Sequence, residues 1–252
     1  MSHSISHCPV SSTRPLRILT ASAVRSIRSP TASGGWRRPR ASSEPVQGAG
    51  GVIVPPDGYL PALRQLCREN EILFVADEVI SGFGRLGEWF ASKLWELDPD
   101  VITLAKGITS GYLPLGATLV SDEIAQGLIN SGYFSHGYTY SGHPTTAAAA
   151  LANLDVLERD GLVPRVRDEI GPYFQQKLRE FAGHPAVGEV RGHGLIGALE
   201  LLPRAGKAGL KEGVIVRGIR DLIAVSPPFT ITRQELDLLF AAIRRTLERL
   251  WR

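Results

Sequence analysis

The chain lacks the long apolar runs of a membrane protein and the cysteine pattern of a disulfide-stapled one. No stretch of its 252 residues approaches the roughly 20 consecutive apolar residues that a membrane helix needs. Its two cysteines, Cys8 and Cys67, lie in unrelated surroundings and form neither a disulfide framework nor a metal-type spacing. These absences predict a protein that does not bind membranes and resides in a reducing compartment, the cytoplasm by default.

Acidic residues are missing from the first 43 positions, which hold seven Arg, eleven Ser and four Pro. The segment has too little apolar surface to offset the entropy of ordering it, and no helical or strand period runs through it. We therefore expect residues 1–43 to be disordered and unrelated to the rest. The same composition is typical of an organelle transit peptide, and a frameshift or misplaced start would also produce it.

The charge of the remaining chain argues against a nucleic-acid partner. The whole chain has a formal net charge of +3, but seven of its 28 Lys and Arg lie in residues 1–43, and the other 21 face 25 Asp and Glu. A mildly acidic body does not present the basic surface that phosphate backbones require.

Apolar runs alternate with helical patterns after Glu44, which predicts α/β architecture. We expect a partial large domain over residues 44–150 and a small α+β domain over 151–252. The strands are predicted at Glu71–Asp77, Val101–Ala105, Leu115–Val120, within Gly188–Leu202, and at Val214–Val216 and Leu222–Val225. The helices are predicted at Pro61–Asn70, Ala91–Leu97, Asp122–Ile129, Thr145–Glu158, Val163–Phe181 and Arg233–Trp251.

Asp77 and Lys106 each follow an apolar strand, and a crossover joins the two strands. In open α/β sheets ligands bind at that edge. An amine there can form an imine with an aldehyde, and a carboxylate can keep a pyridine nitrogen protonated, which makes the ring an electron sink. An isolated Asp or Lys at a strand end is usually a solvated loop residue. Whether Asp77 and Lys106 bind a cofactor therefore has to be judged from the motifs around them.

Those motifs resemble the class III aminotransferases, most closely the branch that acts on omega-amino acids or on amines and pyruvate. The likeness runs from Glu44 to the C-terminus and is carried by four segments in the family's order: EPVQGAGGVIVPPDGYL, LFVADEVISGFGRLGEWFAS, PDVITLAKGITSGYLPLGATLVS and FSHGYTYSGHPTTAAAALANLDVLE. The resemblance implies part of a fold type I pyridoxal-phosphate enzyme. Such an enzyme moves an amino group from an amine or omega-amino acid to a 2-oxo acid such as pyruvate, in two half-reactions.

The resemblance assigns roles to individual residues. Lys106, in the LAKG match, would be the Schiff-base lysine and proton carrier, and Asp77, in ADEV, would pair with the pyridine nitrogen. Val79 would pack on the ring, and Glu44 would support the polar network around Asp77.

Three further residues are assigned to the substrate or to a second subunit. Thr139 would reach the phosphate of the cofactor that the partner subunit binds, and Tyr138 would line the substrate pocket of that subunit. Both roles imply a homodimer. Arg217, ten residues before Pro227 of the SPP match, would bind a substrate carboxylate, because a guanidinium bonds both oxygens at once.

Two other readings of the sequence are weaker. Gly82, Gly84 and Gly87 fit G-x-G-x-x-G, but a dinucleotide site needs these glycines directly after a strand and opening a helix. His136, His143 and His193 have no helical i, i+4 spacing and no accompanying carboxylate, so we expect no metal site.

The resemblance breaks at two places. The family's upstream half, with the turn that cradles the cofactor phosphate, has no counterpart in residues 1–43, and the chain is short near residues 202–213, where relatives carry a full helix. The alternative to an active transaminase is therefore a truncated, catalytically inactive remnant.

Overall fold

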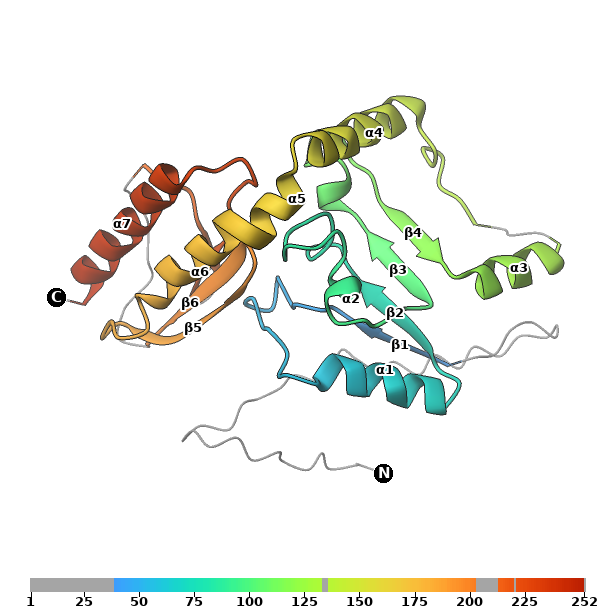
Figure 1. Cartoon of the computed structure of the whole chain (residues 1–252), viewed down its shortest axis with the longest axis horizontal. Helices are drawn as coiled ribbons and strands as arrows, with labels where there is room; N and C mark the ends of the chain where they lie inside the picture. The colour runs from blue at the N-terminus through green and yellow to red at the C-terminus, as the bar shows by residue number, and fades with distance from the viewer. Residues whose placement is uncertain (1–38, 133–135, 203–212, 220, 252) are drawn as a thin grey trace.

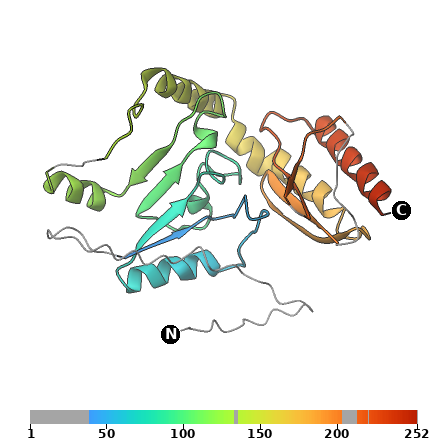
Figure 2. The same cartoon turned by 180° about the vertical axis from the view of Figure 1, so that it is seen from behind.

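A computed structural model of the chain describes residues 39–132, 136–202, 213–219 and 221–251. It contains two four-stranded sheets, with strand orders β1-β2-β3-β4 and β5-β6-β8-β7. Figure 1 shows the first sheet below helix α4 and the second beside helices α6 and α7; seen from behind, the same two bodies are reversed (Figure 2). The α/β class expected from the sequence is confirmed. Tail residues 1–38 and most of the shortened stretch, residues 203–212, lie outside the described part.

The first sheet is mostly parallel. Strands β1 (Arg40–Ser43), β2 (Leu73–Asp77) and β3 (Val101–Leu104) run parallel, and β4 (Ala117–Val120) pairs antiparallel with β3. Helix α1 (Tyr59–Glu69) covers one face, where its buried Leu60 and Cys67 share a cluster with Phe74 and Ala76 of β2. The apolar run of residues 71–77 thus forms an internal strand, as a continuous buried pattern predicts.

Strand β1 corrects the expectation of disorder for the last residues of the tail. Arg40–Ser43 pair with Leu73–Ala76 in parallel register, and Ala41 is buried in the cluster under α1. Backbone pairing with β2 holds this strand, so it needs only one apolar side chain facing the core. The expectation was wrong for these four residues because it considered only the apolar content of the segment.

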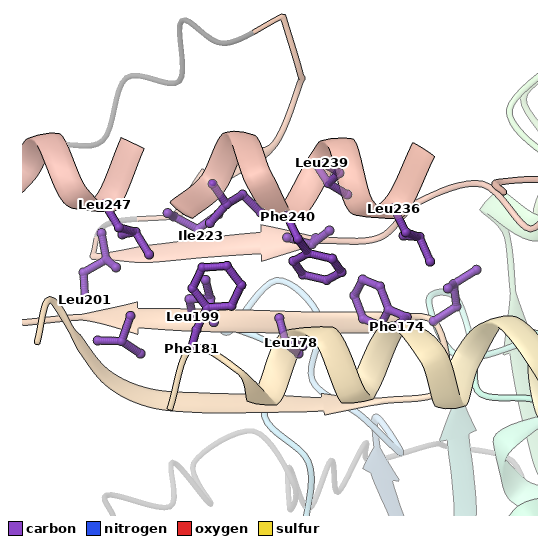
Figure 3. Close-up of a cluster of buried hydrophobic side chains, with 14 of the residues drawn as sticks. Phe174, Leu178, Phe181, Leu199, Leu201, Ile223, Leu236, Leu239, Phe240 and Leu247 are labelled. Carbon is purple, nitrogen blue, oxygen red and sulfur yellow. The ribbon is translucent and has the colours of Figure 1, made fainter. Parts of the chain in front are cut away.

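The second sheet is antiparallel and carries its own core. Its strands are β5 (Val187–His193), β6 (Ile196–Leu201), β7 (Arg217–Ile219) and β8 (Leu222–Val225). Helices α6 (Gly171–Arg179) and α7 (Arg233–Leu250) pack against it, and α7 begins with a capping box between Thr232 and Glu235. Figure 3 shows the side chains of both helices meeting those of β6 and β8 in one apolar cluster.

Val214–Val216, expected as a strand, is irregular, and pairing starts instead at Arg217 opposite Ala224. In a hairpin the turn sets the register, so an apolar run alone does not locate the paired residues.

The remaining helical elements are α2 (Ala91–Leu94), η2 (Lys106–Ile108), α3 (Asp122–Asn130), α4 (Pro144–Arg159), α5 (Leu162–Arg165) and the π-helical η3 (Val166–Ile170). Within the described residues, no helix combines the length and apolar character needed to cross a membrane.

Candidate active site

The carboxyl ends of β2 and β3 bring Asp77 and Lys106 to one edge of the first sheet. Asp77 is the last residue of β2 and lies opposite Thr103 of β3, and Lys106 opens the short helix η2 just after β3. The parallel register therefore brings the carboxylate at the end of β2 and the amine just beyond the end of β3 to the same edge of the sheet, as the two apolar runs predicted.

Lys106 has an unusual backbone conformation. Its φ is +46°, in the left-handed region that few residues other than glycine adopt, and its side chain is exposed. No hydrogen bond or ion pair engages its amine within the part of the chain that the structure describes. Backbone strain of this kind is concentrated at functional sites, where the surrounding structure has to maintain it.

Two neighbouring elements hold the turn that follows Lys106. A Cβ added to Gly107 would lie 2.9 Å from Cβ of Phe83, so only glycine allows the loop after β2 to approach this closely. From the other side, Nδ2 of Asn153 on α4 donates to the carbonyl oxygens of Gly107 at 2.9 Å and Ile108 at 3.2 Å. The lysine-bearing turn is thus enclosed between a loop and a helix.

Asp77 is half-buried and keeps one oxygen available for a ligand. Its Oδ1 accepts a hydrogen bond from the backbone N–H of Val79 at 3.1 Å, and Oδ2 accepts none in the described part of the chain. Val79 itself is half-buried directly beyond the strand. The site thus offers a carboxylate with a fixed orientation beside a branched apolar side chain.

Glu44 completes an electrostatically coupled group. Burial raises the pKa of its carboxyl, a hydrogen bond from the Gly48 N–H lowers it, the nearby Asp77 raises it and Lys106 lowers it; the net result is a pKa above the ordinary value. The Gly48 N–H lies 3.3 Å from Oε2 of Glu44. Glu44 therefore lies within electrostatic reach of both Asp77 and Lys106.

The raised pKa of Glu44 predicts a specific pH dependence of stability. Its folded-state pKa exceeds the ordinary 4.5, so the stability it contributes is complete below that pH and is lost as the pH rises through the folded value. Glu44→Gln, neutral throughout, should therefore become progressively more stable relative to wild type as the pH rises from 4.5 through the folded-state pKa of Glu44. Urea unfolding across this range measures the difference. A stability difference between Glu44→Gln and wild type that does not change with pH would contradict the prediction.

Three predicted residues lie apart from this group. Tyr138 and Thr139 occupy an exposed turn before α4, in which Oγ of Ser141 accepts a hydrogen bond from the Tyr138 N–H at 2.9 Å. Arg217 is exposed at the start of β7 in the second sheet. No hydrogen bond, ion pair or ring contact joins any of the three to Lys106 or Asp77 among the described residues.

Arg85 ties the loop after β2 to the second sheet. Its Nη1 donates to the carbonyl oxygens of Leu195 at 2.9 Å and Pro227 at 2.6 Å, and its guanidinium carbon lies 4.6 Å from the centre of the Phe229 ring. Burial lowers the pKa of Arg85 to about 10. The segment containing Pro227 is thereby held against the loop that also contacts the lysine turn.

The glycine-rich pattern in this loop serves packing. A Cβ on Gly84 would lie 2.8 Å from Cγ2 of Val163, and one on Gly87 would lie 3.0 Å from Cα of Arg167. The loop leads to α2 only at Ala91, so the glycines do not open a helix as a dinucleotide site requires. The close approach to α5 and η3 explains the glycines.

The histidines considered as metal ligands lie in two places. His193 ends β5, where burial lowers its pKa and its ring lies 5.7 Å from that of Trp95, centre to centre. His136 and His143 are exposed in the segment before α4. Among the described residues, no three potential metal ligands form a cluster.

Glu78 and Asn153 are structurally important residues that the sequence analysis missed. The fully buried Glu78 accepts hydrogen bonds from the N–H groups of Ala91 at 2.8 Å and Ser92 at 2.6 Å and from Oγ of Ser81 at 2.8 Å. The signal for Glu78 was a second acid beside Asp77, and that for Asn153 was a single Asn inside an Ala- and Leu-rich helix. Neither signal identifies the partner.

Comparison with known proteins gives a consistent picture. The family model described as aminotransferase class-III matches residues 43–247. A putrescine–pyruvate aminotransferase of Pseudomonas aeruginosa is 44% identical over 221 residues, covering 82% of this chain and 48% of the relative. A mitochondrial gamma-aminobutyrate transaminase of Solanum lycopersicum is 42% identical over 232 residues, covering 82% and 45%.

Solved structures agree with this. An amine transaminase from an uncultivated Pseudomonas species, crystallised in its PLP-bound form, is 44% identical with a TM-score of 0.79, covering 83% of this chain and 52% of that one. An (S)-enantioselective omega-transaminase from Thermomicrobium roseum is 42% identical with a TM-score of 0.78, covering 85% and 51%. The chain spans about half the length of the relatives that it matches.

Proposed function

Because this chain belongs to the class III aminotransferase family, whose members depend on pyridoxal phosphate, we propose that it takes part in moving an amino group from an amine or omega-amino acid to a 2-oxo acid such as pyruvate. We place the reaction in the cytoplasm. The observation that carries the proposal is the group formed by Glu44, Asp77 and Lys106 at the carboxyl edge of the first sheet.

The residues at this edge fit the cofactor. A primary amine that makes no hydrogen bond within the described residues, a carboxylate with one oxygen that accepts none there and a half-buried valine are the groups that a flat aldehyde-bearing pyridine would need. When bound, pyridoxal phosphate withdraws electrons from the substrate carbon and so eases loss of its proton.

The chain's own residues would divide the remaining work. The Lys106 amine would hold the cofactor and then move the proton at the substrate carbon, for which its exposed side chain has freedom. Asp77 would keep the proton on the ring nitrogen, with its orientation set by the Val79 N–H, and Glu44 would support its charge. Val79 would contact the ring face.

Residues outside the group would recognise the substrate and a second subunit. We propose that Arg217 binds a substrate carboxylate through its paired N–H groups, and that Thr139 and Tyr138 reach the phosphate and substrate pocket of a partner subunit. Their exposure in this single chain is compatible with such a homodimer.

Covalent labelling tests the assignment of Lys106. Incubation with pyridoxal phosphate, borohydride reduction and peptide mapping should place the label on Lys106, because its amine has no protein partner in the described part of the chain. Lys106→Ala should lose this label, while Lys93→Ala, which removes another exposed lysine on α2, should keep it. Label that maps mainly elsewhere, or persists in Lys106→Ala, would contradict the assignment.

A turnover assay separates the proposal from the inactive alternative. Chain loaded with pyridoxal phosphate and not treated with borohydride should form alanine from an amine and pyruvate, at a rate that falls in Lys106→Ala. Specific labelling of Lys106 without any alanine would favour the catalytically inactive remnant.

A further inference from the structure

We propose that Asn153 is a positioning residue, which holds the turn carrying Lys106 through two adjacent backbone carbonyls. The consequence for the lysine rests on the proposed function, whereas the hold on the turn does not. Asn153 lies on α4, 47 residues beyond Lys106 in the chain. Figure 1 shows α4 above the sheet that contains β3 and β4.

The contact matches the donor set of an asparagine amide. One nitrogen, Nδ2, carries two N–H groups and donates to the oxygens of Gly107 at 2.9 Å and Ile108 at 3.2 Å. The oxygen of Gly107 also accepts from the Ser110 N–H at 3.3 Å. An aspartate of the same shape has no N–H to donate, so it cannot make either bond.

The turn depends on contacts from outside because its own hydrogen bonds are long. The N–H groups of Ile108 and Thr109 donate to Ala105 and Lys106 at 3.3 and 3.2 Å. Lys106 and Ser110 both have positive φ, at +46° and +50°. A short segment with two unfavourable backbone conformations keeps its shape only if its surroundings hold it.

The helix that carries Asn153 is itself anchored at the same place. Ala150 and Leu157 of α4 are buried in a cluster with Phe83, Leu104 and Ile108. Residues 150, 153, 154 and 157 follow the spacing of one helix face, so the apolar contacts position the helix and Asn153 adds the polar contact. Asn is a poor helix former, and its place in this Ala- and Leu-rich helix is explained by that contact.

Hydrogen–deuterium exchange on the cofactor-free chain tests the hold on the turn. In Asn153→Asp and Asn153→Ala, the amide hydrogens of residues 107–110 should exchange with solvent about tenfold faster than in wild type. This is the effect expected from losing hydrogen bonds to the turn. Asp155→Asn, a substitution at an exposed position of the same helix, is the matched control. It should leave the exchange rates of these amides unchanged. Amides of β6 should not change in any variant. Unchanged exchange at 107–110 in both Asn153 variants would overturn the proposal.

The rate of borohydride-trapped labelling at Lys106 tests whether the hold positions the amine. A displaced amine should react about tenfold or more slowly at limiting pyridoxal phosphate, since small misplacements slow reactions strongly. Faster exchange with an unchanged labelling rate would make Asn153 merely structural and overturn its positioning role. If wild type itself is not labelled at Lys106, the proposed function fails, and exchange alone decides the hold on the turn.

Discussion

Replacing Phe174 by alanine is expected to lower the free energy of unfolding of the second body, the second sheet with helices α6 and α7, by about 3–5 kcal/mol. This is the usual cost of truncating a buried aromatic side chain. Phe174 on α6 is fully buried, and its ring centre lies 5.4 Å from that of Phe240 on α7. Its Cε1 lies only 3.2 Å from where a Cβ on Gly197 of β6 would stand. Tight packing on several sides limits how far the cavity can collapse (Figure 3).

Urea unfolding of the 252-residue chain measures this loss, with hydrogen exchange of β6 and β8 reporting on the second body alone. Gln176→Ala, an exposed neighbour on the same helix, should stay within about 0.5 kcal/mol of wild type. A loss below about 1 kcal/mol for Phe174→Ala would show that this core refills or is loosely packed.

The strands that carry the site could be predicted because each is a continuous apolar run, whose side chains are buried or half-buried in the structure up to Leu104. The run Glu71–Asp77 has apolar residues at almost every position, and it became β2 with only its first two residues outside the strand. The same holds for Val101–Ala105 and β3. Once both strands were parallel neighbours, the proximity of Asp77 and Lys106 followed from topology alone.

Strand β1 could not be predicted by the same reasoning. Its sequence, RASS, has a single apolar side chain that faces the core, and the strand exists because β2 offers unpaired backbone groups beside it. The composition of residues 1–43 predicted disorder instead of a strand. Backbone pairing leaves no side-chain pattern when one buried alanine is enough.

Contacts between distant segments were equally hidden. Helical periodicity shows that Asn153 shares a face with apolar neighbours, but not that the turn after Lys106 packs there. In the same way, sequence alone does not reveal that Glu78 points inward while the adjacent Asp77 borders the site. Alternation along the strand places neighbours on opposite faces, and the tertiary structure decides which face is buried.

Glu78 is expected to be the most costly polar residue to remove near the site. Its two carboxyl oxygens accept three hydrogen bonds, two of them from N–H groups at the start of α2. Glu78→Ala leaves these three donors without an acceptor, at about 1–3 kcal/mol each, so we expect a loss of at least about 3 kcal/mol. Glu78→Gln keeps one acceptor oxygen and should lose less.

The loss should be concentrated in the loop between β2 and α2, because Glu78 joins the two ends of that loop. Exchange of amides in residues 81–92 should therefore accelerate more than that of β6, while Glu158→Ala, an exposed glutamate on α4, should leave both unchanged. The loop also holds Phe83 against Gly107, so a loosened loop should slow labelling of Lys106. Equal acceleration in both sheets would instead mean global unfolding, and an unchanged loop would show that water replaces the lost carboxyl group.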